Sequence, residues 1–222
     1  MPTTETLKNT PAAGNGRGRL AIDAPVRMFH ALFALCFFAA WATSECERWR
    51  AVHVMVGYGM AGLLLFRLAY GLFGPPQARL SRLPERCRGL LARLWPDKAG
   101  GPASAVSGGG LAALQNAAMA LAVLGLLALV AAALVSGYLA WNDAPEWVAD
   151  LHEEMGEALI ALAVAHIALV AGFSLLRGRN LAIPMLTGRI PGPGEDLIPH
   201  SRPWLAAALL AAVCAFAVVC VV

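Results

Sequence analysis

The chain has 222 residues, a length that suits one or two soluble domains. Its composition excludes that class, because 59% of the residues are hydrophobic, 14% are charged and the mean hydropathy is +0.63, whereas a soluble domain usually has about 25% charged residues. The net charge of +3 is small, and the basic residues of the chain lie between apolar runs. This distribution excludes the single basic surface of a nucleic-acid-binding protein. We therefore expect an integral membrane protein that has the lipid bilayer as a partner.

Five apolar segments approach or exceed the roughly 20 residues that a membrane-spanning helix needs. In chain order they cover residues 25–42, 51–73, 111–141, 150–176 and 203–222. Pro25 suits a first helical turn, and Gly74, Pro75 and Pro76 end the second segment. The preceding residues 1–20 are polar and rich in Gly, Pro and Thr, so we expect a disordered cytoplasmic tail.

The basic residues indicate how these segments are oriented. The N-terminal segment and the loops 74–110 and 177–202 are basic, so the positive-inside rule places them in the cytoplasm. The connection 43–50 is mixed in charge and the connection 142–151 is acidic, which places both in the periplasm. These assignments alternate consistently along the chain. The middle of the loop 74–110 has the composition of a short amphipathic helix on the membrane surface.

Four histidines lie within the predicted spans: His30 in the first, His53 in the second, and His152 and His166 in the fourth. An ionisable group inside a membrane is costly and usually functional. The 14 residues between His152 and His166 correspond to a rise of about 21 Å and a rotation of about 40°. These two histidines therefore share one helix face but belong to two different sites.

Helix direction pairs the remaining histidines by depth. The first helix enters from the cytoplasm with His30 near its start, and His166 lies near the cytoplasmic end of the fourth helix. His53 and His152 lie near the periplasmic starts of their helices. A structural zinc site needs four protein ligands and a catalytic one usually three, whereas two opposed imidazoles match the axial positions of a haem. We therefore predict two haem b groups, with iron ligands His30 and His166 at one level and His53 and His152 at the other.

Charged and small residues near these positions agree with two haems. Arg27 lies one turn before His30, and Arg67 lies 14 residues after His53 on the same helix face, so both are candidate partners for the propionates of the cytoplasmic haem. Glycines in the spans would let helices or a flat macrocycle approach closely; they are Gly57, Gly59, Gly62, Gly125, Gly137 and Gly156.

Several motifs carry a family resemblance. They are Asp-Ala-Pro-Val-Arg-Met-Phe-His at 23–30, His-Val-Met-Val-Gly-Tyr at 53–58, Leu-Leu-Phe-Arg at 64–67, Leu-His-Glu at 151–153 and the segment 180–189. Together they resemble the bacterial di-haem cytochrome b561 family, which includes the b-type subunits of nickel–iron hydrogenases. Two features differ from the hydrogenase subunits and many other relatives: the connection before the fourth helix is short, and Gly-Gly-Gly-Leu replaces a Gly-His-Asn-Pro motif before the third.

The resemblance covers about residues 20–190 and implies a four-helix haem core in the bacterial inner membrane. The expected fold class is an all-α membrane protein, a four-helix transmembrane haem-binding bundle with a fifth C-terminal transmembrane helix. We expect three parts: the tail 1–20, a di-haem cytochrome b domain 21–190, and a loop with the last helix at 191–222. The expected role is that of an electron carrier or an electron-transfer subunit of an oxidoreductase. It would connect the quinone pool with a periplasmic c-type cytochrome or a hydrogenase small subunit.

Two other functions remain open at this stage. A stand-alone superoxide:quinone oxidoreductase would favour a basic periplasmic surface that steers the anion, but the periplasmic loops are mixed or acidic. A histidine-based metal or proton transporter would carry Asp or Glu beside the histidines at mid-membrane, but the interiors of these spans contain little charge.

Overall fold

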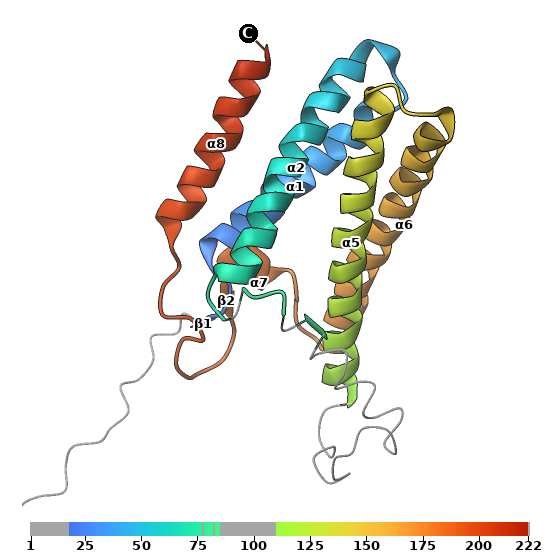
Figure 1. The fold of residues 1–222 in the computed structure, drawn as a ribbon. Helices are drawn as coiled ribbons and strands as arrows, with labels where there is room; N and C mark the ends of the chain where they lie inside the picture. Colours follow the sequence, from blue (N-terminus) through green and yellow to red (C-terminus); the bar gives the residue numbers. More distant parts are fainter. Residues whose placement is uncertain (1–17, 77, 82, 85–109, 222) are drawn as a thin grey trace, which may run out of the picture.

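Five long helices dominate the computed structural model, which describes residues 18–76, 78–81, 83–84 and 110–221 (Figure 1). They are α1 (Ala24–Thr43), α2 (Arg50–Phe73), α5 (Gly110–Trp141), α6 (Glu146–Leu176) and α8 (Pro203–Val221). The short elements are β1 (Arg19–Leu20), the 3-10 helix η1 (Glu47–Trp49), α7 (Ile183–Thr187) and β2 (Arg189–Ile190). All five long helices are long and apolar enough to cross a membrane. The chain is therefore a multi-pass, all-α membrane protein, and the predicted fold class is confirmed.

Local sequence explains where the helices begin and end. Asp23 precedes α1 and its side chain accepts a hydrogen bond from the backbone N–H of Val26 at 3.4 Å, with Pro25 in the first turn. Helix α2 ends at Phe73, and Gly74 and two prolines follow directly. Helix α6 starts four residues earlier than predicted, because Pro145 lies just before its first turn and Glu146 suits the positive end of the helix dipole.

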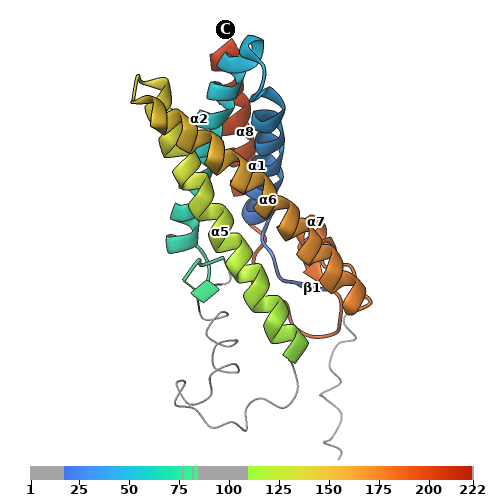
Figure 2. The ribbon, with the colours of Figure 1, turned by 90° about the vertical axis from the view of Figure 1, so that its right-hand side faces the viewer.

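The helices form two antiparallel pairs with an extra helix on one side. Helix α1 packs against α2 and α5 packs against α6, and the two pairs meet along α2 and α5. Helix α8 packs mainly against α1, on the side away from α5 and α6, and its C-terminus lies at the same end of the bundle as the connection between α1 and α2 (Figures 1 and 2). Helix α8 thus lies outside the four-helix core and packs on one side of it.

Apolar side chains hold these pairs together at two places. Leu64 of α2, Val130 and Ala133 of α5, and Leu159 of α6 form one buried cluster. Phe29 and Leu32 of α1 pack with Leu63 of α2 in the other. The first cluster joins the two helix pairs and therefore determines which face of α2 is turned toward α5 and α6.

The two ends of the bundle differ. We name the end formed by residues 44–49 and 142–145 the short-loop end. The end formed by residues 18–23, 74–76, 78–81 and 177–202 is named the basic end, after its arginines; it lies at the bottom of Figure 1.

A clasp at the basic end joins the start of α1 to the segment after α6. Strand β1 pairs antiparallel with β2, and the N–H groups of Ala21 and Ile22 both donate to the carbonyl of Gly188, at 2.8 and 3.0 Å. Arg19 and Leu20 were predicted to belong to the disordered tail; they instead form β1, because the segment 188–197 supplies partners for their backbone. Residues 1–17 and most of the predicted amphipathic helix in the loop 74–110 lie outside the described residues.

Candidate functional site

His53 and His152 face each other near the short-loop end. Their ring centres are 6.0 Å apart and the ring planes make an angle of 82°. His53 lies in the first turn of α2 and His152 lies in the second turn of α6. The two imidazoles come from different halves of the bundle, and both are partly buried.

Both imidazoles are oriented by backbone carbonyls. The Nδ1 atom of His53 lies 2.9 Å from the carbonyl oxygen of Ala40 in α1, and Nδ1 of His152 lies 2.9 Å from that of Ala133 in α5. A carbonyl oxygen only accepts hydrogen bonds, so each Nδ1 must carry the hydrogen. In the neutral ring the Nε2 atom then keeps its lone pair for a metal. The hydroxyl of Ser136 lies 3.4 Å from Nδ1 of His152 and adds a weaker contact.

Glycines leave room around these two rings. A Cβ atom on Gly137 of α5 would lie 2.7 Å from Cε1 of His152, so this position admits only glycine while the ring stays in place. Gly57 and Gly156 each lie one turn after a histidine, on the same helix face, and a Cβ on either would meet no atom within 4 Å. The face between His53 and His152 is therefore open toward the middle of the bundle.

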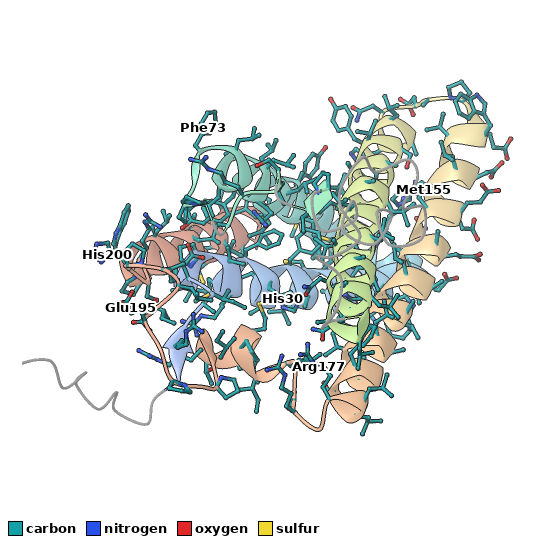
Figure 3. All side chains as sticks on the ribbon, turned by 90° about the horizontal axis from the view of Figure 1, so that it is seen from below. His30, Phe73, Met155, Arg177, Glu195 and His200 are labelled. Carbon is teal, nitrogen blue, oxygen red and sulfur yellow. The ribbon has the colours of Figure 1, made fainter. Side chains whose placement is uncertain are left out.

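His30 and His166 lie at the other level, toward the basic end. The rise between His152 and His166 is about 21 Å. His30 and His166 are near enough to interact electrostatically. Nδ1 of His166 is buried and has no hydrogen-bond partner among the described residues. His30 is exposed, and Figure 3 shows it between α8 and α5 when the molecule is seen from the basic end.

The two predicted propionate partners are held by carbonyl groups at the basic end. Nη1 of Arg27 donates to the carbonyl of Leu186 at 2.7 Å, while its Nε is buried without a partner in the described part of the chain. Nη1 of Arg67 donates to the carbonyl of Ala78 at 3.1 Å. Both guanidinium groups thus lie at the end of the bundle toward which His30 and His166 are placed.

Sequence reasoning missed a buried polar cluster at the basic end. The hydroxyl of Tyr70 donates to Oδ2 of Asp23, and Nη1 of Arg202 lies 3.8 Å from the same oxygen. The Asp23 side chain is only 3% exposed. The one available signal was the position of Asp23 at the head of the 23–30 motif, where a helix-capping role is the ordinary explanation.

The fold and these contacts define an integral membrane helix bundle with imidazoles paired between its helices. The sequence profile of prokaryotic cytochrome b561 matches residues 21–188, and the chain belongs to this family. It is therefore a membrane b-type cytochrome that binds b-type haem and serves in electron transfer. The match ends before α8. Comparison with curated proteins gave no match, and neither did comparison with solved structures.

Proposed function

We propose that the chain binds two b-type haems and carries electrons through the membrane between a quinone and a redox partner at the short-loop end. One haem is held by His53 and His152 and the other by His30 and His166. The redox partner is a periplasmic c-type cytochrome or a hydrogenase small subunit, which places the short-loop end in the periplasm and the N-terminus in the cytoplasm of a bacterial inner membrane. The arrangement of His53 and His152 is the observation that carries this proposal.

The distance between these two rings supports a shared iron atom. A metal–imidazole bond is about 2.0–2.1 Å long, so two imidazoles on opposite sides of one metal have ring centres about 6 Å apart. The observed separation is 6.0 Å. Both rings donate through Nδ1 to a carbonyl, an arrangement that is usual for a metal-ligating histidine. The donor set, its spacing and its second hydrogen bonds therefore all fit a bis-histidine haem.

The second level rests on the chemistry of its donor set. Buried polar atoms normally have a partner, and the unpaired Nδ1 of His166 is an exception within the described residues. His30 is exposed, so its ring is free to face an additional group. Arg27 and Arg67 supply positive charge at this end, which suits anionic propionates in a region of low dielectric constant. These features support a second haem at this level.

The alternatives fit these residues less well. Among the residues that the structure describes, no three side chains of His, Cys, Asp or Glu come together, whereas a zinc centre needs three or four. This disfavours a metal transporter. The short-loop end exposes Glu45, Glu47, Asp143 and Glu146 beside Arg48 and Arg50, and a surface with this excess of acidic groups does not favour the steering of superoxide.

The roles of the protein residues follow from their contacts. The haem supplies one-electron chemistry when it is bound. The carbonyls of Ala40 and Ala133 hold the two imidazoles in one tautomer and one orientation, and Gly137 leaves room for the ring of His152. Arg27 and Arg67 provide counter-charges at the basic end. The protein thus holds two ligand pairs at two depths of the bundle.

The test is a haem determination on the purified chain and its histidine variants. Pyridine haemochrome spectra should give two non-covalent b-type haems per chain. Replacing His53 or His152 by Ala should remove one haem, and replacing both should remove no more than that one. His30→Ala and His166→Ala should behave in the same way at the second level, while His200→Ala is the matched control. A well-folded protein that contains no haem, although it was produced with haem in full supply, would overturn the proposal. So would histidine variants whose haem losses do not pair in this way.

A further inference from the structure

A shallow cavity of about 400 Å³, open to the surface, lies at the basic end between the end of α2 and the start of α8. Its apolar walls include Phe66 and Phe73 from α2 and Trp204 from α8. Tyr70 and Arg202 bring polar groups to the same cavity. Cavities of about 300–1,000 Å³ with mostly apolar walls and a few polar groups are the usual binding sites of small molecules.

The polar side of the cavity is a connected cluster. The Tyr70 hydroxyl donates to the buried carboxylate of Asp23, and Nη1 of Arg202 lies 3.5 Å from that hydroxyl and 3.8 Å from the carboxylate. A guanidinium group has five N–H donors, and these two contacts engage Nη1. The remaining N–H groups of Arg202, which is about one-third exposed, are therefore placed to donate to a ligand.

The shape and charge of the site indicate the class of ligand. The rings of Phe66 and Tyr70 are stacked, with centres 5.6 Å apart and an angle of 12°, and both residues line the cavity. Among the residues that the structure describes, Arg202 is the one charged residue that lines the cavity, and the carboxylate of Asp23 opposes its charge. A flat, neutral ring with hydrogen-bond-accepting oxygens and an apolar tail meets all these conditions. We propose that this cavity binds the head group of a quinone.

This inference rests on the proposed function, in which a quinone exchanges electrons with the haems. Reducing one quinone to a quinol requires two electrons, delivered singly through the electron-transfer chain of the protein, and two protons on its two oxygens. The protons come from water at the basic end. Asp23 caps α1 and His30 lies seven residues later, a rise of about 10 Å, so the polar cluster beside the cavity lies about 10 Å from the level of His30, at the same end of the bundle.

The site combines the family core with a part of the chain outside it. Phe66, Tyr70 and Phe73 belong to the residues that the cytochrome b561 profile matches, which end at 188, whereas Arg202 and Trp204 do not. Helix α8 packs on α1 and α2 and thereby brings one wall and the guanidinium group to the cavity. The fifth helix therefore completes the proposed quinone site.

The direct test is photolabelling of the purified, haem-loaded protein with an azido-benzoquinone that carries a decyl tail. Mass spectrometry should find the label on the end of α2 and on residues 202–205. In a binding titration with the same quinone in the dark, Arg202→Leu should weaken binding about tenfold, because it removes charge-assisted hydrogen bonds. Tyr70→Phe should weaken it by a smaller factor. Arg179→Leu, an exposed arginine at the same end, is the matched control and should leave binding unchanged.

Haem content, measured on the same samples, separates failure of this inference from failure of the proposed function. Two haems together with a label elsewhere in the chain, or binding that Arg202→Leu does not change, would refute the placement of the quinone while leaving the haem proposal intact. Native mass spectrometry that finds an anionic phospholipid held by Arg202, with no quinone label nearby, would assign the cavity to lipid instead. Labelling of the unmodified protein keeps the test valid if Arg202→Leu folds poorly.

Discussion

Replacing Gly137 by Ala should remove one haem without weakening the helix that carries the change. The added Cβ would lie 2.7 Å from Cε1 of His152, and ordinary contact begins at 3.4 Å, so the ring must move by about 0.7 Å. Ala133 lies one turn before Gly137, so a shift away from α5 would also lengthen the 2.9 Å hydrogen bond to Ala133 beyond the usual limit. Metal sites tolerate errors of only about 0.2 Å in ligand position.

The assay is the ratio of haem to protein, with reduced-minus-oxidised spectra and a thermal unfolding curve in the same detergent. We expect the ratio to fall from two to one. Alanine is a better helix former than glycine by roughly 1 kcal/mol. The haem-free variant should therefore be at least as stable as the haem-free unmodified protein. The loss would then come from the displaced imidazole and not from a damaged helix.

Gly172→Ala is the matched control, because a Cβ there meets no atom within 4 Å. This variant should keep both haems. If Gly137→Ala also kept two haems with unchanged spectra, His152 would not be held against α5 as described, and the assignment of this ring as an iron ligand would lose its main structural support.

Three further outcomes test other parts of the reasoning. Gly156→Leu should lose the haem at His53 and His152. A Cβ at this position meets no protein atom within 4 Å, and the larger side chain would occupy the space that we assign to the macrocycle. A haem-to-protein ratio that stays at two would contradict this. The haem kept by His30→Ala, at His53 and His152, should have a lower reduction potential than the haem kept by His53→Ala. The reason is that Nδ1–H donation to carbonyls makes His53 and His152 stronger electron donors to the iron. A redox titration that gives the opposite order would refute the argument. Asp23→Asn should weaken the attachment of α8 by about 1–2 kcal/mol, because Arg202 loses its ion pair. Limited proteolysis between residues 188 and 202 should then become faster. Unchanged cleavage would show that this ion pair does not hold the segment.

The positions of the spanning helices could be predicted from the sequence. Long apolar runs ended by Gly, Pro or charged residues locate such helices almost directly, and the structure moves their ends by four residues or fewer. The nearness of His53 and His152 also follows from sequence, because antiparallel helices place residues near their starts at one end of the bundle. The role of these histidines as haem ligands stays a prediction, as does that of His30, His166, Arg27 and Arg67.

The supporting contacts could not be predicted. The acceptors for Nδ1 of His53 and His152 are backbone carbonyls, which every residue has, so no residue type marks them. Gly137 matters only because α5 and α6 pack closely at that point. The cluster of Asp23, Tyr70 and Arg202 joins three distant parts of the chain, and no local pattern indicates such a meeting.

The clasp at the basic end has a consequence for the order of assembly. A chain is made from its N-terminus, so α1 is complete long before Gly188 exists to accept hydrogen bonds from Ala21 and Ile22. Gly188 itself needs a left-handed backbone, with φ at +78°, and a Cβ there would press on the carbonyl of Ile22 at 2.8 Å. The start of the first helix therefore becomes fixed only after the fourth has been synthesised, and we expect cofactor insertion beside His30 to wait for that moment.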